Sequence, residues 1–527
     1  MKGSAALLAS RRFQRARHGM LSIVVVLSSW NAPASACAAG PDNADRPGDA
    51  RRPNIILIMA DDLGWTDLGS FGSDYYETPA IDRLASQGIR FTNHHHCPNC
   101  APTRAAIMSG QHGARTGIYT VGNIDRFDWS MRPLVPVENV TRLPLDRRTI
   151  ADSLKAAGYA TAMFGKWHLG NDKAHHPSAR GFDEAIESSG RHKNFETDPP
   201  VRVPEETYLA DFRSTGAGDL SRRHAARPFF LYLPHFAVHA PHQAKPAMIE
   251  RFSDKPAARG HHNPTYAAMI ASLDQSVGRI MASLDELSLA DDTLLIFTSD
   301  NGGVGGYRGE GLGEKHDTTD NAPLRSGKGS LYEGGLRVPL IIRWPGIVSP
   351  GRSCNEPTQH IDFYPTLLEA TGARPPSHRL DGESLMPLLS GSAASLERTA
   401  IFQHFPGYLG IGPNRWRTTP VSVVQEGHWK LMEFLEDGRL ELYNLDHDIG
   451  ESENLAASEP ERASRMQRRL VDWRREVNAP LPKRADAKAA TGGRARIDDG
   501  RSTPAHGQNP ANPKKGRKER QRVDHST

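Results

Sequence analysis

The chain has 527 residues, of which 38% are hydrophobic and 24% charged, and its mean hydropathy is −0.55. This composition is typical of a soluble globular protein and excludes a multi-span membrane protein or a coiled-coil rod. The basic residues are concentrated at the ends: residues 1–36 carry five Lys/Arg and no acid, and residues 480–527 carry twelve against five. Because the whole chain has a formal charge of +4, residues 37–479 carry −8, so we expect no nucleic-acid partner.

The N-terminus has the three-part pattern of a secretory signal. Four arginines between Arg11 and Arg17 precede the apolar run 21–27, and the small residues 34–36 follow. The apolar run is too short to span a bilayer, so we expect no transmembrane span. Residues 1–36 are therefore predicted to be a signal peptide, and the mature protein periplasmic or secreted. A lipid anchor at Cys37 is less favoured, because Ala34 stands where a lipobox has a branched aliphatic residue.

Further along the chain, apolar runs alternate with segments that have helical spacing. Continuous apolar runs predict strands buried on both faces, at 54–59, 160–164, 229–233, 293–297 and 338–342. Helices are predicted between these runs, at 78–87, 149–157, 266–287 and 362–371. This alternation indicates a doubly wound α/β sheet.

The pattern changes after about residue 375. Short strands are predicted at 421–424, 428–434 and 440–442, followed by a helix at 460–477, which together suggest a smaller antiparallel subdomain. We divide the mature chain into an N-terminal arm (37–52), a main domain (53–375), a C-terminal subdomain (376–479) and a basic tail (480–527). The tail is predicted to be disordered, since it has few large apolar residues to bury.

Polar side chains follow several of the predicted strands, where ligands bind in open α/β sheets. Asp61 and Asp62 end the first run, and Asp300 and Asn301 end the run at 293–299. Three carboxylates and an amide oxygen at one sheet edge suit Ca²⁺ or Mg²⁺. The alternative is that an Asp after a strand caps a helix or forms a turn. Lys166, His168 and His239 also follow predicted strands.

The segment from Cys97 to Arg104 allows three interpretations. Cys97 and Cys100 form a Cys-x-x-Cys pair, as in redox proteins and zinc sites, but no second pair or thioredoxin-like setting accompanies it. Both cysteines could instead be small buried hydrophobic residues. Third, Cys100 begins the pattern Cys-Ala-Pro-Thr-Arg, with Gly110 six residues beyond Arg104.

In this third interpretation the chain resembles the type I sulfatase family, over roughly residues 53–455. The family's other landmarks follow in order, at 61–64, 78–84, 165–170, 239–241, 299–302 and 327–335. The resemblance implies an alkaline-phosphatase-like α/β fold, with a doubly wound mostly parallel sheet and a smaller C-terminal antiparallel-sheet subdomain. It also implies hydrolysis of sulfate esters, with 53–375 as the catalytic domain.

The resemblance further implies that a separate formylglycine-generating enzyme oxidises Cys100 to formylglycine (3-oxoalanine). One hydroxyl of the hydrated aldehyde attacks sulfur, and the other drives elimination of sulfate. Thr103 replaces the commoner Ser, a variant that the family also uses.

The family pattern also implies the remaining site residues. Asp61, Asp62, Asp300 and Asn301, with modified Cys100, would hold Ca²⁺, or Mg²⁺ in its place. The catalytic residues would be Cys100, Arg104, Lys166, His168, His239 and Lys328, with His239 as the general acid and both lysines on sulfate oxygens. Arg104 would share a helix face with Cys100, and Lys166 and His168 would point the same way on an extended segment.

The expected substrate is a sulfated carbohydrate or another sulfate monoester. Two alternatives stay open besides a redox protein: a phosphonate or phosphate monoester hydrolase of related fold, and a sulfoglycan-binding protein with unmodified Cys100. Among weaker candidates, we expect His94, His95 and His96 to line the pocket mouth, with at most two converging. Tyr408 and Trp416 could stack on a sugar, although core positions are the simpler interpretation.

Overall fold

The computed structural model describes residues 52–307, 312, 317–412 and 415–485. The predicted signal peptide with Cys37, nearly all of the N-terminal arm and most of the basic tail lie outside these residues. No helix within the described ranges is long and apolar enough to cross a membrane.

A central sheet of eight strands forms the framework of the protein. Its order is β10-β2-β9-β8-β1-β7-β5-β6. The strands are β1 (Asn54–Ala60), β2 (Ile89–Phe91), β5 (Ala160–Gly165), β6 (Glu184–Glu187), β7 (Phe229–Pro234), β8 (Thr293–Ser299), β9 (Leu340–Arg343) and β10 (Arg352–Cys354). All neighbours pair in parallel except β9, which is antiparallel to β8 and β2.

The centre of this sheet is buried on both faces, as the apolar runs predicted. In β1 the side chains of Ile55, Leu57 and Met59 belong to one hydrophobic cluster and those of Ile56 and Ile58 to another. Because successive side chains of a strand point to opposite faces, a strand with helices on both sides needs an unbroken apolar run. The predicted doubly wound, mostly parallel sheet is confirmed.

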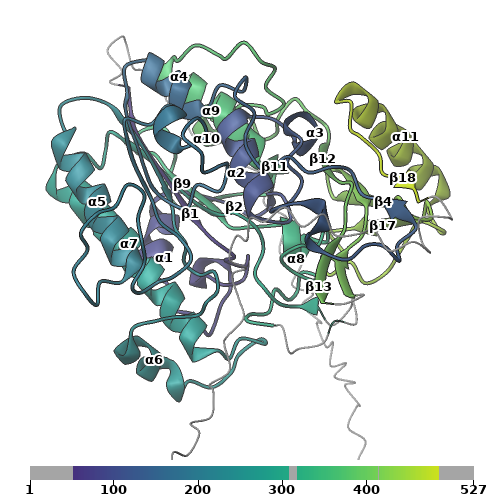
Figure 1. The fold of residues 1–527 in the computed structure, drawn as a ribbon, viewed down its shortest axis with the longest axis horizontal. Helices are drawn as coiled ribbons and strands as arrows, with labels where there is room; N and C mark the ends of the chain where they lie inside the picture. The colour runs from purple at the N-terminus through teal and green to yellow at the C-terminus, as the bar shows by residue number, and fades with distance from the viewer. Residues whose placement is uncertain (1–51, 308–311, 313–316, 413–414, 486–527) are drawn as a thin grey trace, which may run out of the picture. The chain divides into compact units, whose positions relative to one another are not determined.

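Helices cover both faces of the sheet (Figure 1). The first layer is formed by α1 (Pro79–Gln87), α5 (Leu209–Arg223), α6 (Pro246–Ser253) and α7 (Pro264–Glu286). The opposite layer contains α2 (Cys100–Ser109), α4 (Ile150–Ala156), α9 (Phe363–Thr371) and α10 (Met386–Ser390). Two short helices, α3 (Gly113–Thr116) and α8 (Glu333–Leu336), lie in the connections.

The C-terminal part forms a second, antiparallel sheet in the order β12-β15-β16-β17. Its strands are β12 (Ile401–Phe405), β15 (Val421–Glu426), β16 (Trp429–Phe434) and β17 (Leu440–Asn444), and α11 (Pro460–Glu476) packs on it. The hairpin β13 (Leu409–Gly412) and β14 (Arg415–Thr418) precedes β15. Strand β12 was not predicted, since its sequence Ile-Phe-Gln-His-Phe is too short to stand out from the preceding loop.

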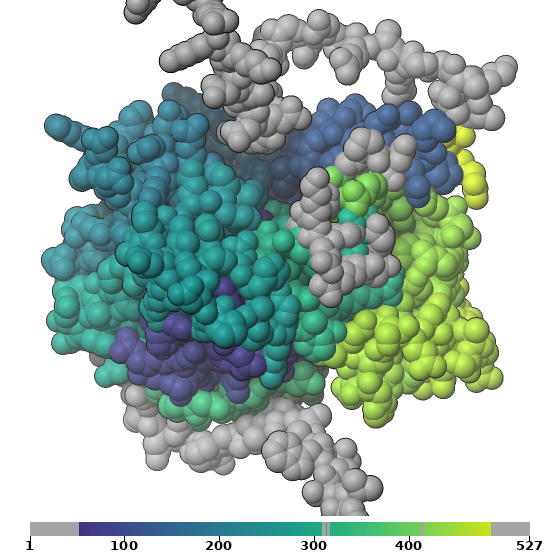
Figure 2. Space-filling model, turned by 90° about the horizontal axis from the view of Figure 1, so that it is seen from below, coloured from purple at the N-terminus to yellow at the C-terminus, as the bar shows by residue number. Residues whose placement is uncertain are grey.

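Two small ladders join segments that are distant in the sequence. Strand β3 (His94–His95) pairs with β11 (Thr358–Gln359), and β4 (Leu134–Val135) pairs with β18 (Lys483–Arg484). Strand β18 lies just beyond residue 479, and its backbone pairing with β4, rather than apolar burial, positions it. Figure 2 shows the blue segment near residue 130 beside the yellow-green C-terminal residues.

Candidate active site

Several of the predicted site residues follow central strands of the main sheet. Asp61 and Asp62 come directly after β1, and Asp300 comes directly after β8, which pairs with β1 in parallel. Lys166 follows β5, and His239 lies in the loop after β7. Because these strands are parallel neighbours, their carboxyl ends bring the polar side chains to one edge of the sheet.

Helix α2 brings Cys100 and Arg104 to this edge. Cys100 is its first residue and Arg104 lies one turn later, so both side chains share a face, as predicted. The fully buried Arg104 donates to Asp300 Oδ2 at 2.7 Å and to the Lys166 carbonyl at 2.6 Å. One guanidinium thus ties α2 to the ends of β5 and β8.

Asp61 connects the cysteine to a lysine. Lys166 Nζ donates to Asp61 Oδ2 at 2.6 Å, and the Cys100 thiol donates to Asp61 Oδ1 at 3.6 Å. Burial raises the pKa of Asp61, but Lys166 and other nearby cations outweigh it and hold the pKa well below the usual range. The Asp61 carboxyl is therefore ionised at neutral pH.

Asp62 contacts the other side of the site. Its carboxylate forms an ion pair with Lys328 Nζ at 2.6 Å and accepts a hydrogen bond from the Asn301 amide at 2.8 Å. The Asp62 backbone N–H donates to Asp300 Oδ1 at 3.1 Å. Asp62 has a φ of 67°, a left-handed conformation that aspartate tolerates better than most residues. The turn lets the two successive carboxylates reach different cations.

A glycine-rich loop places Lys328. The Lys328 N–H donates to the Gly303 carbonyl at 2.9 Å, and the Asn321 side chain bonds the backbone of Gly303, Gly305 and Ser326. A Cβ on Gly302 would collide with the Gly334 carbonyl. Glycine is required here because two stretches of backbone approach closely.

The two predicted histidines lie near these charges. His239 donates from Nδ1 to the Ala240 carbonyl at 2.6 Å, which leaves Nε2 facing Asp62 at 3.7 Å. His168 has a buried Nδ1 without a hydrogen-bond partner, and burial with the nearby Lys166 lowers its pKa well below the usual value. Its φ of 65° lies in the left-handed region, so the segment that carries Lys166 and His168 is not extended at His168, contrary to the expectation.

The cluster fits a divalent cation. One ligand atom from each of Asp61, Asp62, Cys100 and His239 lies within 4.8 Å of the others. Asn301 Oδ1 is buried with no hydrogen-bond partner, although the Asn301 amide nitrogen is bonded. A buried carbonyl oxygen without a donor is costly unless a cation or water contacts it. Carboxylates with such an oxygen are the donor set that Ca²⁺ and Mg²⁺ prefer.

Comparison with known proteins agrees with this geometry. The family model described as Sulfatase matches residues 53–373. The chain belongs to the sulfatase family. A second family model, N-sulphoglucosamine sulphohydrolase, C-terminal, matches residues 327–476 of this sulfatase. This confirms the resemblance to the sulfatase family that the sequence motifs indicated. It also confirms the predicted alkaline-phosphatase-like fold and the prediction that the protein is a sulfatase.

Individual relatives match most of this sulfatase. The Formosa agariphila protein named Sulfatase is 35% identical, covering 82% of this chain and 90% of its own. The Mus musculus steryl-sulfatase is 34% identical, covering 73% and 70%. The crystal structure of Ps i-CgsB in complex with k-i-k-neocarrahexaose has a TM-score of 0.68 at 28% identity, covering 83% of this chain and 96% of its own.

The redox interpretation of this sulfatase disagrees with the structure. Cys97 and Cys100 are both free, buried thiols, not the disulfide that a redox pair predicts. Cys97 Sγ lies 3.3 Å from His360 Nε2, away from the charged cluster. Burial raises the pKa of Cys100 to about 12, so its thiol is protonated at neutral pH.

The histidine triplet does not line a pocket mouth, which corrects the expectation. His94, His95 and His96 are at most 1% exposed. The His94 and His96 ring nitrogens lie 2.8 Å apart, whereas His95 pairs with Glu333. Two of the three rings therefore converge, as predicted, but in the interior and not at a pocket mouth. They are buried because β3 pairs with β11 in the interior, a contact between distant segments.

Two supporting residues of this sulfatase were not predicted. His192 Nε2 donates to the His239 carbonyl at 2.8 Å while its ring packs on Phe236. The Tyr307 hydroxyl donates to the Lys328 carbonyl at 2.8 Å. Each donates a hydrogen bond to the backbone carbonyl of a predicted site residue that is distant in the sequence. No local sequence motif indicates such a contact.

Proposed function

We propose that this sulfatase is an exported, Ca²⁺-dependent enzyme that removes sulfate from a sulfated carbohydrate, with Cys100 converted to formylglycine. The main support is the buried cluster, in which Asp61 contacts Cys100 and Lys166 while Asp62 contacts Lys328 and Asn301. In this proposal the nucleophile, the cations for the sulfate oxygens and the metal ligands would all come from this cluster.

Asp61, Asp62, Asp300 and Asn301, with an oxygen of modified Cys100, would hold the metal, and Mg²⁺ is the alternative ion. When bound, the cation would supply positive charge beside the sulfate group. Asn301 Oδ1 supports this assignment, since it lacks a protein donor.

Conversion of Cys100 to formylglycine would supply a hydroxyl nucleophile in place of a thiol. Arg104 lies on the same helix face and would steady negative charge there. Such conversion requires a formylglycine-generating enzyme as a partner during maturation.

The remaining charged residues would act on the substrate. Lys166 and Lys328 would neutralise the sulfate oxygens, because sulfate esters are attacked only where their negative charge is balanced. His239 would give a proton from Nε2 to the departing alkoxide, with its ring held through Nδ1 by the Ala240 carbonyl. His168 would contact the modified Cys100.

The carbohydrate assignment has two supports. The Ps i-CgsB structure contains a neocarrahexaose, and the C-terminal family model is named for an N-sulphoglucosamine sulphohydrolase. The named steryl-sulfatase relative makes steroid sulfates the necessary comparison. Export is proposed from the N-terminal pattern of basic, apolar and small residues.

Peptide mass spectrometry across Cys100 tests the nucleophile first. The protein is exported from a host that makes formylglycine and compared with Cys100→Ala. We expect the mass of the aldehyde in place of the thiol, and the same change is expected to be absent from a host without the modifying enzyme. An unmodified thiol in the competent host would contradict the proposed nucleophile and favour a sulfoglycan-binding protein.

Sulfate release then tests the substrate. The modified protein is assayed with sulfated oligosaccharides, a steroid sulfate, 4-nitrophenyl sulfate and 4-nitrophenyl phosphate. We expect the highest kcat/KM on an oligosaccharide. A preference for phosphate would support the phosphomonoesterase alternative, and a preference for the steroid would overturn the carbohydrate assignment.

A further inference from the structure

Arg417, on β14 of the C-terminal part, lies against the loop that carries Lys328. Its guanidinium is 4.9 Å from the ring centroid of Tyr307, and the Tyr307 hydroxyl donates to the Lys328 carbonyl. A Cβ on Gly329 would contact the Arg417 side chain at 2.9 Å. Arg417 is therefore a direct neighbour of the Lys328 segment.

Among the residues that the structure describes, no carboxylate is paired with Arg417. Its side chain makes no hydrogen bond or ion pair with any residue that the structure describes, and its Nε is buried without a partner. By contrast, Arg104, Lys166 and Lys328 each contact a carboxylate of the central cluster. Guanidinium groups bind carboxylate and sulfate-like oxyanions well, because their N–H donors form a planar fork.

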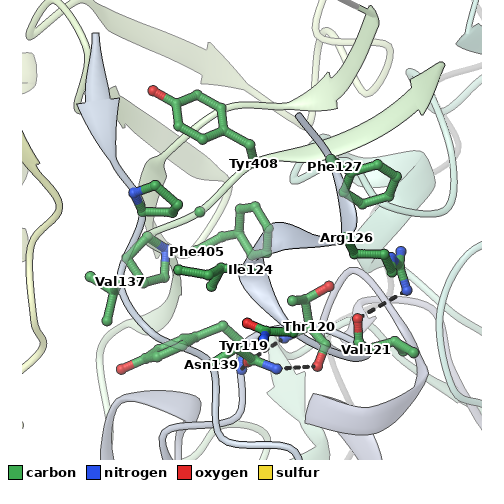
Figure 3. Close-up of a pocket in the computed structure, with 14 residues that line it drawn as sticks. Tyr119, Thr120, Val121, Ile124, Arg126, Phe127, Val137, Asn139, Phe405 and Tyr408 are labelled. Atoms are coloured by element: carbon green, nitrogen blue, oxygen red, sulfur yellow. Dashed lines mark hydrogen bonds between the residues drawn. The ribbon is translucent and has the colours of Figure 1, made fainter. Parts of the chain in front are cut away.

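Arg126 approaches from the side of Cys100. Thr120 accepts a hydrogen bond at 3.0 Å from Asn99, the residue before Cys100, and Arg126 donates to the Val121 carbonyl at 2.9 Å. Within the described chain Arg126 also has no ion pair. Figure 3 shows Arg126 at one edge of a pocket whose lining includes residues between 119 and 127 and residues 405–408. Burial lowers the pKa of Arg126, and repulsion from Arg417 adds to this lowering.

Aromatic rings connect the two arginines. Phe127 and Trp416, their neighbours in the chain, pack edge to face with centroids 6.3 Å apart, and Trp416 packs on Tyr408 at 5.3 Å. A nearby third arginine, Arg132, stacks on Tyr408 and Trp416, but Arg132 is paired with Glu436 at 3.0 Å. Within the described part of the chain, Arg132 is thus paired with a carboxylate while Arg126 and Arg417 are not.

We propose that Arg126 and Arg417 form a second anion subsite beside the sulfate-binding centre, which holds another sulfate or a carboxylate of the same substrate. This rests on the proposed function and narrows it, because the preferred substrate would then be a carbohydrate with at least two acidic groups. One group would occupy the Lys166 and Lys328 centre while the second meets the paired arginines.

The test compares substrates that differ by one acidic group. Wild type, Arg417→Gln, Arg126→Gln and the control Arg132→Gln are assayed with a singly sulfated neutral oligosaccharide, its doubly sulfated form and a form with one sulfate and one uronate. For each protein, kcat/KM on the better dianionic substrate is divided by kcat/KM on the singly sulfated one. We expect this ratio to be about tenfold lower in Arg417→Gln than in wild type, because that is the usual scale for a lost charge-assisted hydrogen bond. The two dianionic substrates distinguish a second sulfate from a carboxylate.

Binding gives an independent readout. Titration of the same oligosaccharides into Cys100→Ala, with and without Arg417→Gln, is expected to show weaker binding of the dianionic forms in the double variant. Melting curves of each variant check that it is folded. An unchanged ratio and unchanged binding in both arginine variants would overturn the subsite, as would an equal change in Arg132→Gln. If wild type releases sulfate from none of these sugars, the carbohydrate assignment fails instead.

Discussion

Asp62 shows how a single backbone conformation organises the charged centre. Its left-handed φ turns the chain just after β1, so that Asp61 contacts Lys166 while Asp62 contacts Lys328. Each buried carboxylate thereby has its own cation, and burial without such a partner would be costly. Together with the pair of Arg104 and Asp300, the result is a dense set of paired charges from five separate segments of the chain.

Asn301 gives a prediction about the metal. Asn301→Ala removes the unpartnered Oδ1, and we expect the Ca²⁺ concentration needed for half-maximal stabilisation to rise at least about tenfold. Thermal unfolding at increasing Ca²⁺ measures this, since a ligand of the native state raises Tm. Chelation with EDTA is expected to lower the Tm of wild type more than that of the variant. Equal Ca²⁺ dependence in both proteins would contradict the assignment of Asn301.

His239 gives a prediction about proton transfer. A general acid matters most when the leaving group is a poor one. We therefore expect His239→Ala to reduce kcat on an alkyl or sugar sulfate about 10² to 10⁴-fold, and far less on 4-nitrophenyl sulfate. His192→Phe, which keeps a ring but loses the bond to the His239 carbonyl, should show a weaker form of the same pattern. Equal losses on both substrates would rule out the role of general acid.

At the scale of elements, α1 is capped by another helix. Thr78 precedes α1 but makes no capping bond, because its hydroxyl contacts Asp82 and the Gly69 N–H. Instead Asp274 of α7 accepts from Ile81 N at 2.8 Å and from Ala80 N at 3.2 Å. The start of one helix thus depends on the packing of a second helix nearly 200 residues later.

Replacing Asp274 tests this cap. We expect Asp274→Ala to lower the free energy of unfolding by about 1 to 2 kcal/mol, the range for loss of a helix cap. Asp274→Asn keeps an acceptor oxygen and is expected to lose less. Urea unfolding followed by circular dichroism compares the three proteins. Equal stability of Asp274→Ala and wild type would show that the cap contributes nothing.

At the scale of the molecule, the second sheet is packed against the catalytic part. Tyr119 and Leu331 share a hydrophobic cluster with Phe405 and Val423 of the C-terminal sheet. The buried Lys430 of β16 bonds Glu333 of α8 at 2.8 Å. Leu331 and Glu333 closely follow Lys328, so these contacts hold the C-terminal sheet beside the Lys328 loop.

A half-buried histidine near this junction predicts acid sensitivity. His404 bonds Ser422 at 2.8 Å and the Pro480 carbonyl at 2.9 Å, and burial lowers its pKa to about 4. A lowered pKa means that the neutral ring stabilises the fold above the unfolded value of about 6.5, and that this stability is lost as pH falls towards 4. We expect Tm to fall between pH 7 and pH 4.5.

The variant His404→Gln checks the source of this effect. Glutamine offers both a donor and an acceptor but does not titrate. Its Tm is expected to be lower than that of wild type at pH 7, with a smaller decrease on acidification. A decrease as large as that of wild type would assign the acid sensitivity to other groups, such as His360, whose pKa burial also lowers to about 4.

The sequence by itself determined the central strands of the main sheet, the family and the residues that meet at the centre. A continuous apolar run such as 54–59 is typical of a strand that is covered on both faces. Asp61, Asp62, Asp300 and Asn301 directly follow two such runs. Since parallel strands align their carboxyl ends, position along the chain was enough to bring these four together.

Only the tertiary structure decided the contacts between distant loops. It placed the triplet from His94 to His96 in the interior and bent the chain at His168. It also brought Phe127 and Trp416, the chain neighbours of Arg126 and Arg417, into contact. Each of these outcomes depends on packing between segments far apart in the chain. Local spacing carries no information about that packing, because the same residue is buried or exposed according to which segment covers it.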